Sequence, residues 1–342
     1  MNALEPLAAT LRRSPRRWLV TGVAGFIGSN LLQALLEAEQ TVVGLDNFAT
    51  GHRANLDQVR AAVAPAQWER FRLIEGDVAE PGTCAEAVRA ADVVLHQAAI
   101  GSVPRSIDQP LESNAANVTG HLALLDATRR AGVRRFVYAS SSAVYGDEPS
   151  LPKVEGRLGR PLSPYAVTKL ADELYAGTYG LLHGMQTVGL RYFNVFGPRQ
   201  DPQGAYAAVI PRWIAAMLRR QEVRINGTGE TSRDFCYVAN VVQANLLAAT
   251  TAREDALNQV YNVAFGRRTT LLELYEALRC RLAAVEPSLA DARPVHGPFR
   301  AGDVLHSLAD VDKACSLLGY RPTHSLEQGL DESLEWYRRN LS

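Results

Sequence analysis

The chain has 342 residues, of which 47% are hydrophobic, so it can bury a large core built as one α/β unit with a smaller lobe. Its 36 basic and 36 acidic residues balance, which leaves no net field to attract nucleic acid or an anionic membrane surface. The four cysteines lack CxxC spacing and the seven histidines form no ligand-like pair, so we expect a reduced, cytoplasmic protein with no metal site.

Residues 1–17 form an arginine-bearing extension without the long apolar segment or cleavage site of a signal peptide, and we expect a short helical or frayed segment there. No apolar run approaches the ~18 residues that a transmembrane helix needs. Continuous apolar runs alternate with helical patterns, which is typical of a parallel sheet covered on both faces. This pattern predicts a doubly wound, Rossmann-like α/β fold. The expected strands are 18–21, 41–46, 71–74, 93–96, 136–139 and 187–190.

The segment after the first strand is rich in glycine and leads into an amphipathic helix. Gly22, Gly25 and Gly28 stand where a tight turn, the close approach of a phosphate and helix–strand packing leave no room for a side chain. Asp46 ends the second strand, where a carboxylate accepts hydrogen bonds from both ribose hydroxyls and repels a 2′-phosphate. Arg53 lies well past that strand end, so the pattern favours NAD over NADP.

Two later strand ends offer further contacts to this cofactor. Asp77 and Val78 follow the third strand and are placed to contact adenine. Gln97 and two alanines follow the fourth strand, where small residues let a cofactor pass close to the backbone. The expected cofactor-binding residues are Gly22, Ala24, Gly25, Phe26, Ile27, Gly28, Asp46, Asn47, Phe48, Gly51, Asp77, Val78, Gln97, Ala98, Ala99, Tyr165, Lys169 and Tyr192.

Tyr165 and Lys169 lie four residues apart in a predicted helix and therefore share one face. A nearby ammonium favours the phenolate form of a tyrosine, because a cation stabilises the charged state of an acid. A free phenol loses its proton near pH ~10, so work as a base at neutral pH needs such support. The pair is a candidate catalytic base with its supporting cation, although such pairs also occur on ordinary helix surfaces.

From Arg191 onward, prolines and glycines punctuate shorter elements, and a strand-like run returns at 260–264. We expect residues 18–190, with returning segments at about 233–265, to form the NAD-binding domain. Residues 191–232 and 266–342 would form the substrate-binding lobe.

Together, the motifs resemble those of the extended short-chain dehydrogenase/reductase family, and within it the NAD-dependent sugar-nucleotide 4-epimerases. The resemblance runs from about Trp18 to the C-terminus. It is strongest to UDP-N-acetylglucosamine 4-epimerases of bacterial polysaccharide pathways, through the loop at 101–106 and the N-terminal extension. The matching motifs are Gly22–Gly28, Leu45–Asn47, His96–Ala99, Ser140–Gly146, Tyr165–Lys169, Arg191–Asn194, Gly227–Phe235 and Arg300–Asp303.

The resemblance implies reversible inversion at C4 of a UDP-sugar through a transient 4-keto intermediate, with an NAD that stays bound. Tyr165 would take the proton from the sugar 4-hydroxyl, and Lys169 would hold the nicotinamide ribose and keep that tyrosine ionised. Ser141 would hydrogen-bond the same sugar oxygen. These three residues are the expected catalytic group.

The resemblance also implies a site for the UDP group. Asn194 would bind the diphosphate, with Arg233 and Arg300 as counter-charges, because guanidinium forks suit phosphate oxygens. Asp303 would accept a hydrogen bond from the uridine ribose. Alternatively, Arg233 and Asp234 would merely neutralise each other on a surface. The expected substrate-binding residues are Gly101, Ser102, Ser141, Ser142, Tyr165, Asn194, Arg233, Arg300, Asp303 and Ser307.

Substrate choice depends on Ser307, four residues beyond Asp303. The resemblance implies a bulky tyrosine here in enzymes restricted to UDP-glucose and UDP-galactose. A serine leaves room for a 2-acetamido group, which Gly101, Ser102 and Ser142 would help to line. We therefore expect UDP-GlcNAc and UDP-GalNAc as substrates, with UDP-glucose and UDP-galactose, or UDP-N-acetylhexosaminuronates, as alternatives.

Other activities of the same scaffold fit less well. Residues 141–143 lack the carboxyl group that dehydratases and decarboxylases place there. A net reductase usually uses NADPH, which Asp46 disfavours. A non-catalytic NAD-binding sensor would be expected to lose Tyr165, Lys169 or Ser141, and all three are present.

Two predicted helices, 112–130 and the one that carries Tyr165, have leucine-rich faces. They resemble the helices through which this family dimerises, so a homodimer is expected, with no nucleic acid or membrane as partner. The alternative is that both faces only cover the sheet.

Overall fold

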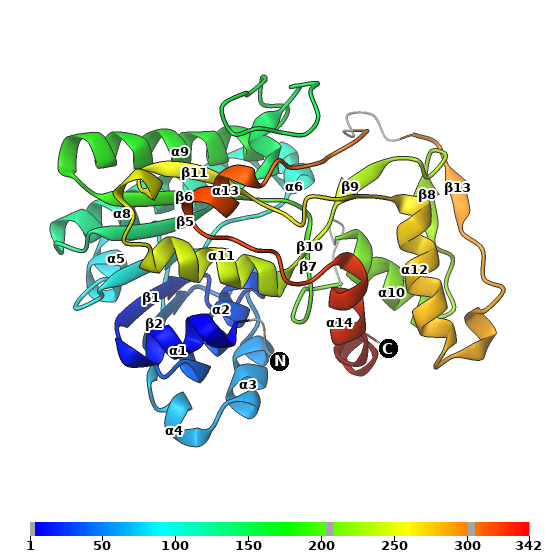
Figure 1. Ribbon diagram of the computed structural model, residues 1–342, viewed down its shortest axis with the longest axis horizontal. Helices are drawn as coiled ribbons and strands as arrows, with labels where there is room; N and C mark the ends of the chain where they lie inside the picture. Colours follow the sequence, from blue (N-terminus) through cyan, green and yellow to red (C-terminus); the bar gives the residue numbers. More distant parts are fainter. Residues whose placement is uncertain (1–3, 203–207, 300–304, 342) are drawn as a thin grey trace.

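The computed structural model of the protein describes residues 4–202, 208–299 and 305–341. Its centre is a seven-stranded sheet in the order β11-β6-β5-β4-β1-β2-β3 (Figure 1), in which every neighbouring pair is parallel. The predicted Rossmann-like fold is confirmed, and each expected strand is present to within two residues at either end. The strands are β1 Arg17–Thr21, β2 Thr41–Asp46, β3 Phe71–Glu75, β4 Val93–His96, β5 Arg135–Ser141, β6 Gln186–Tyr192 and β11 Gln259–Val263.

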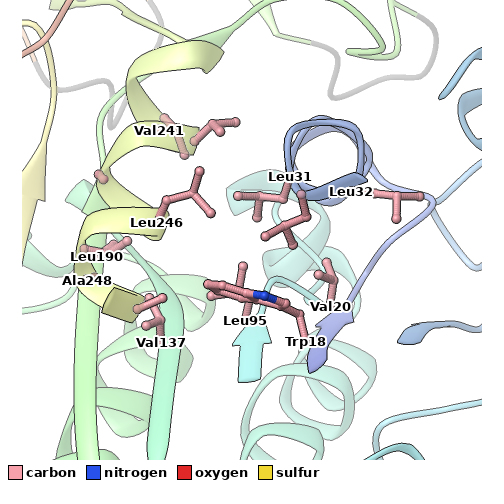
Figure 2. Close-up of a cluster of buried hydrophobic side chains, with 14 of the residues drawn as sticks. Trp18, Val20, Leu31, Leu32, Leu95, Val137, Leu190, Val241, Leu246 and Ala248 are labelled. Carbon is pink, nitrogen blue, oxygen red and sulfur yellow. The ribbon is translucent and has the colours of Figure 1, made fainter. Parts of the chain in front are cut away.

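Helices cover both faces of this sheet, because successive residues of a buried strand point to opposite sides. Trp18 and Val20 of β1 pack beneath α2 and α11 (Figure 2), whereas Leu19 packs on the other face against the α8 side. The helices of the two faces are α1 Glu5–Arg13, α2 Phe26–Glu37, α3 Arg53–Ala62 and α11 Val238–Thr250 on one side, and α5 Pro81–Ala87, α8 Gly120–Arg130 and α9 Pro164–His183 on the other.

The N-terminal extension contains the helix α1 rather than a frayed segment. Leu11 is only 2% exposed and joins the same apolar core as α2. Arg12 donates to Glu5 within the helix and to the carbonyl of Glu37 at the end of α2. The arginine-bearing segment is thus tied to the first helix of the sheet.

A second apolar core lies outside the sheet, in a lobe that includes the last helix of the chain. Trp213, Leu274 and Tyr337 are among the buried side chains that join its three main helices. The elements of this region are β7 Val195–Phe196, α10 Val209–Leu218, β8 Arg224–Asn226, β9 Ser232–Asp234, β10 Cys236–Tyr237, β12 Arg268–Thr270, α12 Leu271–Ala283, β13 Val295–Gly297 and α14 Leu326–Leu341. The short helix α13 Asp312–Leu317 packs instead against β11, where Ala314 joins the core of the sheet.

The predicted continuous helix 112–130 is wrong in one respect. The chain forms α7 (Pro110–Asn114), then a π-helical turn (Ala115–Thr119), and only then α8. Gly120 follows the turn. A larger residue would not fit at this position, because a Cβ there would lie 2.7 Å from a methyl group of Val78. Single π turns inside helices often mark functional sites, and this one borders the cavity described next.

Candidate active site

Two neighbouring cavities, one at the carboxyl edge of the sheet and one in the lobe, share part of their walls. The larger, of about 660 Å³, is lined by the glycine loop and by the residues that follow β2, β3, β4 and β5. It sits where the strand order reverses between β1 and β4, the place at which open α/β sheets bind ligands. The smaller, of about 280 Å³, lies in the lobe. The walls of both include Asn194, Val195 and Gln200.

The glycine loop leaves backbone groups open to the larger cavity. Gly22 has φ +65°, and a Cβ there would lie 2.8 Å from the amide nitrogen of Ala98. A Cβ on Gly28 would lie 2.0 Å from the carbonyl oxygen of Gly22. No side chain caps α2, which begins after Gly25, so its first N–H groups remain available to an anion. These features fit the pyrophosphate of a dinucleotide.

Asp46 is buried at the end of β2, and its two oxygens accept the N–H groups of Ala24 and Phe48 at 2.8 Å each. Burial raises the pKa of this carboxyl, and the two N–H groups oppose the shift. Arg53, the alternative partner for a 2′-phosphate, donates to Glu75 at 2.5 Å and stacks on the Phe48 ring. The guanidinium is thus engaged by another carboxylate, and the site fits NAD.

Tyr165 lies in the first turn of α9 and lines the larger cavity. The turn begins at Ser163, whose Oγ accepts the N–H of Ala166, with Pro164 at the first helical position. The N–H of Tyr165, still without a partner within the helix, donates to Ser106 Oγ at 3.0 Å. The backbone that carries the phenol is therefore fixed on two sides.

Lys169 lies one turn further along and also lines this cavity, although only 2% of the residue is exposed. Its ammonium donates to the carbonyl of Ala139 at 3.1 Å and to Asp172 Oδ2 at 3.2 Å. Ser141 ends β5 on the same wall, and its Oγ accepts the N–H of Ala143 at 3.1 Å. The Ser141 hydroxyl therefore keeps its own proton to donate. The structure brings the three predicted catalytic residues to one cavity.

Further residues hold this wall together and were not predicted. Glu173, the residue after Asp172, accepts two hydrogen bonds from Arg191 at 2.7 and 2.8 Å and one from Ser140 at 2.5 Å. Asn117, in the π turn, bonds both to the backbone of Ile100 and to the hydroxyl of Thr168 on α9. The position of Glu173 one turn after Lys169 was a usable signal, whereas nothing in the local sequence marks Asn117.

The smaller cavity combines arginines with aromatic rings. Arg233 was predicted there, whereas Arg212, Arg224 and the ring of Phe299 were not. Guanidinium groups beside aromatic faces suit a planar, anionic ligand. Asp234 does not neutralise its neighbour on the surface: it is fully buried and accepts the N–H groups of residues 265, 266 and 309. Burial raises the pKa of Asp234 to about 7, against these hydrogen bonds.

Some predicted residues lie beside the cavities rather than in their walls. Ser102 caps α6 (Val103–Asp108) through the N–H of Arg105. The N–H of Ser307 donates to the carbonyl of Ser232 at 3.0 Å, next to Arg233. Arg300 and Asp303 lie outside the described residues. The others outside the two linings are Ala24, Phe48 and Ser142.

Two features are absent from the part of the chain that the structure describes. Over 4–202, 208–299 and 305–341, no three His, Cys, Asp or Glu side chains are grouped to hold a metal ion. Within the same ranges, none of the helices has the length and apolar character to span a membrane.

The sequence profile described as the NAD dependent epimerase/dehydratase family matches residues 18–264. The chain belongs to this family. The family resemblance predicted from the motifs is thereby confirmed, as is NAD as the cofactor. Within this epimerase/dehydratase family, a UDP-glucose 4-epimerase from Mycolicibacterium smegmatis is 35% identical over 326 residues, covering 94% of this chain and 98% of that enzyme.

Two solved structures of UDP-sugar 4-epimerases are similar over nearly their whole length. The UDP-N-acetylglucosamine 4-epimerase from Methanobrevibacter ruminantium, in complex with UDP-N-acetylmuramic acid, has a TM-score of 0.86 and 36% identity, covering 95% of this chain and 99% of that one. The UDP-glucuronic acid 4-epimerase from Bacillus cereus, in complex with UDP-glucuronic acid and NAD, has a TM-score of 0.82 and 31% identity, covering 94% and 99%.

Proposed function

We propose that this protein is a UDP-N-acetylglucosamine 4-epimerase, which interconverts UDP-GlcNAc and UDP-GalNAc through a transient 4-keto sugar. Similarity to three UDP-sugar 4-epimerases supports the general activity, which is NAD-dependent inversion at C4 of a UDP-sugar. The observation that carries the reaction is the placement of Tyr165, Lys169 and Ser141 on the wall of the cavity that the glycine loop also lines.

Each residue of this cavity wall has its own proposed role in the reaction. Bound NAD supplies the acceptor and then the donor of the hydrogen at C4. Tyr165 takes the proton of the 4-hydroxyl and returns it after inversion. The Ser141 hydroxyl, whose oxygen is occupied by the N–H of Ala143, donates to the same sugar oxygen. Lys169, held by two partners, keeps one N–H for the ribose of the cofactor.

Elimination of water needs an additional acid and base near the sugar, which the end of β5 does not provide. Residues 141–143 are Ser-Ser-Ala, and Glu173, which accepts a hydrogen bond from Ser140 of the same strand, is also paired with Arg191. Inversion at C4 needs only one base, because the same proton leaves and returns. This difference favours epimerase over the dehydratases of the same family.

The UDP group would occupy the smaller cavity. Asn194 lies on the walls of both cavities, at the junction where a diphosphate would connect the nucleoside to the sugar. Arg233 was expected to bind the diphosphate, and Arg212 and Arg224 add positive charge to the same cavity. Phe299 and the apolar wall would cover the uracil ring.

The acetamido preference is supported by the small side chain at Ser307. This residue is half-buried, and its N–H donates to Ser232 of the β9 strand that carries Arg233. We propose that its side chain faces the sugar, so that a larger side chain would reach the 2-substituent. Gln200 borders both cavities, and its buried Oε1 has no hydrogen-bond partner in the part of the chain that the structure describes. This acceptor lies near the place where we propose that an acetamide N–H is satisfied.

The direct test is proton NMR of the purified protein with UDP-GlcNAc and no added cofactor, run in parallel with UDP-glucose and a UDP-N-acetylhexosaminuronate. We expect UDP-GalNAc to accumulate, with kcat/KM for the acetamido sugar at least about tenfold above that for UDP-glucose. Faster turnover of UDP-glucose or of the uronate would overturn the substrate assignment. Absence of inversion with all three sugars would overturn the epimerase itself.

Ser307→Tyr should remove the acetamido activity and spare the plain hexoses. A bulky ring at this position clashes with the 2-acetamido group, whereas a 2-hydroxyl still fits. We expect kcat/KM for UDP-GlcNAc to fall about 10–100-fold while that for UDP-glucose changes less than about threefold. Ser316→Tyr, on the exposed end of α13, is the matched control. An equal loss with both sugars would contradict the pocket assignment.

We further propose that a second copy of the chain covers one face of α9. Leu174 is 65% exposed and Leu181 85%, and with Val167 they recur every seven residues as one apolar stripe. Leu111 of α7, at 85% exposure, extends the stripe sideways, since α7 packs beside α9. Leu124 and Leu125 of α8 instead pack on the sheet. Self-complementary helix faces of this kind suit a twofold dimer.

Changing Leu174 and Leu181 together to glutamate should yield monomers. Two unpaired charges cannot be buried in an apolar interface without a large penalty, so we expect at least about 100-fold weaker self-association. Light scattering of the purified variants measures the mass directly. Val285→Glu, on the exposed surface of the lobe, is the control and should leave the dimer intact. A wild-type monomer at micromolar concentration, or a dimeric double variant, would refute the interface.

A further inference from the structure

A row of polar side chains lies buried behind Lys169, away from the cavity. Asp172 of α9 and His121 of α8 are fully buried, and His96 of β4 is 2% exposed. The His96 and His121 rings lie 5.3 Å apart, and His96 Nδ1 is 2.7 Å from Thr21 Oγ1. Apart from Lys169, none of these groups has a part in the proposed reaction.

Asp172 is the counter-charge of the Lys169 ammonium. A buried ammonium costs several kcal/mol unless it is paired, and Asp172 Oδ2 accepts one of its N–H groups at 3.2 Å. Burial raises the pKa of Asp172 to about 6, and Lys169 opposes the shift. Because this value lies below neutral pH, the carboxyl of Asp172 is mainly ionised at pH 7.

Among the residues that the structure describes, Lys169 is the cation that pairs with this carboxylate. Within 4–202, 208–299 and 305–341, Asp172 Oδ1 has no hydrogen-bond partner, and His121 Nδ1 lies 3.9 Å from it, too far for a hydrogen bond. Burial lowers the pKa of His121 well below its usual value and that of His96 to about 3, so both rings are neutral. The remaining ionisable neighbours are Tyr138 of β5 and Glu173 of α9, which is itself paired with Arg191.

We propose that Asp172 is a positioning residue of the reaction: it fixes the Lys169 ammonium against the Ala139 carbonyl and limits the positive charge that Tyr165 experiences. The first effect leaves one N–H of the ammonium for a ligand in the cavity. The second follows from Coulomb's law in a dry site, where a carboxylate beside an ammonium offsets part of its field. This inference rests on the proposed function, in which Tyr165 is the base.

Asp172→Asn removes the negative charge and keeps the size and shape of the side chain. The amide oxygen still accepts from Lys169, but the negative charge is gone, so the ammonium acts on Tyr165 with its full field. The ionised tyrosine should then persist to lower pH, and the acid limb of the kcat–pH profile should move down by up to about one pH unit. Bound NAD per subunit should stay near one. Asp126→Asn, an equivalent change on α8 at a carboxylate paired with Arg129 and Arg130, should leave the profile unmoved.

Asp172→Ser removes the same charge with a smaller side chain and is the second variant. This variant should also move the acid limb to lower pH. Because the hydrogen bond to Lys169 is lost, the amount of NAD that stays bound through gel filtration should fall at least about threefold. An acid limb that stays in place or moves up in a folded variant would overturn the proposal. Unfolding of both variants would also overturn it, since a positioning residue is not required for folding. If wild-type enzyme inverts no UDP-sugar, the proposed function fails; if it does and the limb is unmoved, only the role of Asp172 fails.

Discussion

Tyr165→Phe is expected to lower kcat for inversion at C4 by about a thousandfold, because the substitution removes the only proposed base and nothing else. The anchor of this residue, its N–H to Ser106 Oγ, belongs to the backbone and survives the change. The glycine loop and Asp46 are untouched, so NAD should still copurify. The measurement is the initial rate of UDP-GalNAc formation by NMR, with bound NAD determined by its absorbance after denaturation.

Tyr175→Phe is the control for this substitution. It removes the same hydroxyl from the same helix, at a position 38% exposed and outside both cavities, and it should leave kcat unchanged within about twofold. If Tyr165→Phe, folded and loaded with NAD, keeps more than about a tenth of the wild-type rate, the phenol is not the base.

Gly28→Ala should abolish retention of NAD. The added Cβ would lie 2.0 Å from the carbonyl oxygen of Gly22 and 2.7 Å from its carbonyl carbon, both backbone atoms, so the loop must move. A displaced loop no longer presents its N–H groups to the pyrophosphate, and a loss of about 100-fold in affinity corresponds to roughly 2.7 kcal/mol. Calorimetric titration of NAD into the protein, stripped of cofactor, gives the affinity.

Gly82→Ala tests whether any glycine change would do the same. Gly82 lies in α5, and no atom lies within 4 Å of the Cβ that an alanine would add. This variant should bind NAD as the wild type does and be slightly more stable, since glycine is a poor helix former. Wild-type amounts of NAD in purified Gly28→Ala would show that cofactor binding by the glycine loop does not depend on the close approach of residue 28 to Gly22.

Much of the site was predictable because its parts are local in sequence. The buried strands read as continuous apolar runs, and the glycine loop between β1 and α2 reads as a phosphate cradle before any contact is known. The pairing of Tyr165 with Lys169 follows from helical spacing alone. Parallel pairing then places the ends of these strands at one edge, which brings the local motifs together.

The unpredicted parts depend on contacts between distant segments. The π turn after α7 interrupts a leucine-rich pattern that predicts one continuous helix. The need for glycine at position 120 comes from its contact with Val78, which is distant in the sequence. Arg212 and Arg224 face the lobe cavity because separate elements of the lobe pack there. Asp172 has a neutral histidine from α8 behind it, and no periodicity in α9 reveals that neighbour. Such positions are determined by tertiary packing.

The most direct test of the central claim follows the hydrogen at C4. UDP-GlcNAc carrying deuterium at C4 is incubated in ordinary water with the purified protein and no added cofactor, and the UDP-GalNAc formed is analysed by NMR and mass spectrometry. Removal and return of the same hydrogen within one closed site predicts that the product keeps its deuterium at C4. Loss of the label to the solvent would contradict the mechanism, because inversion would then proceed through exchange with water.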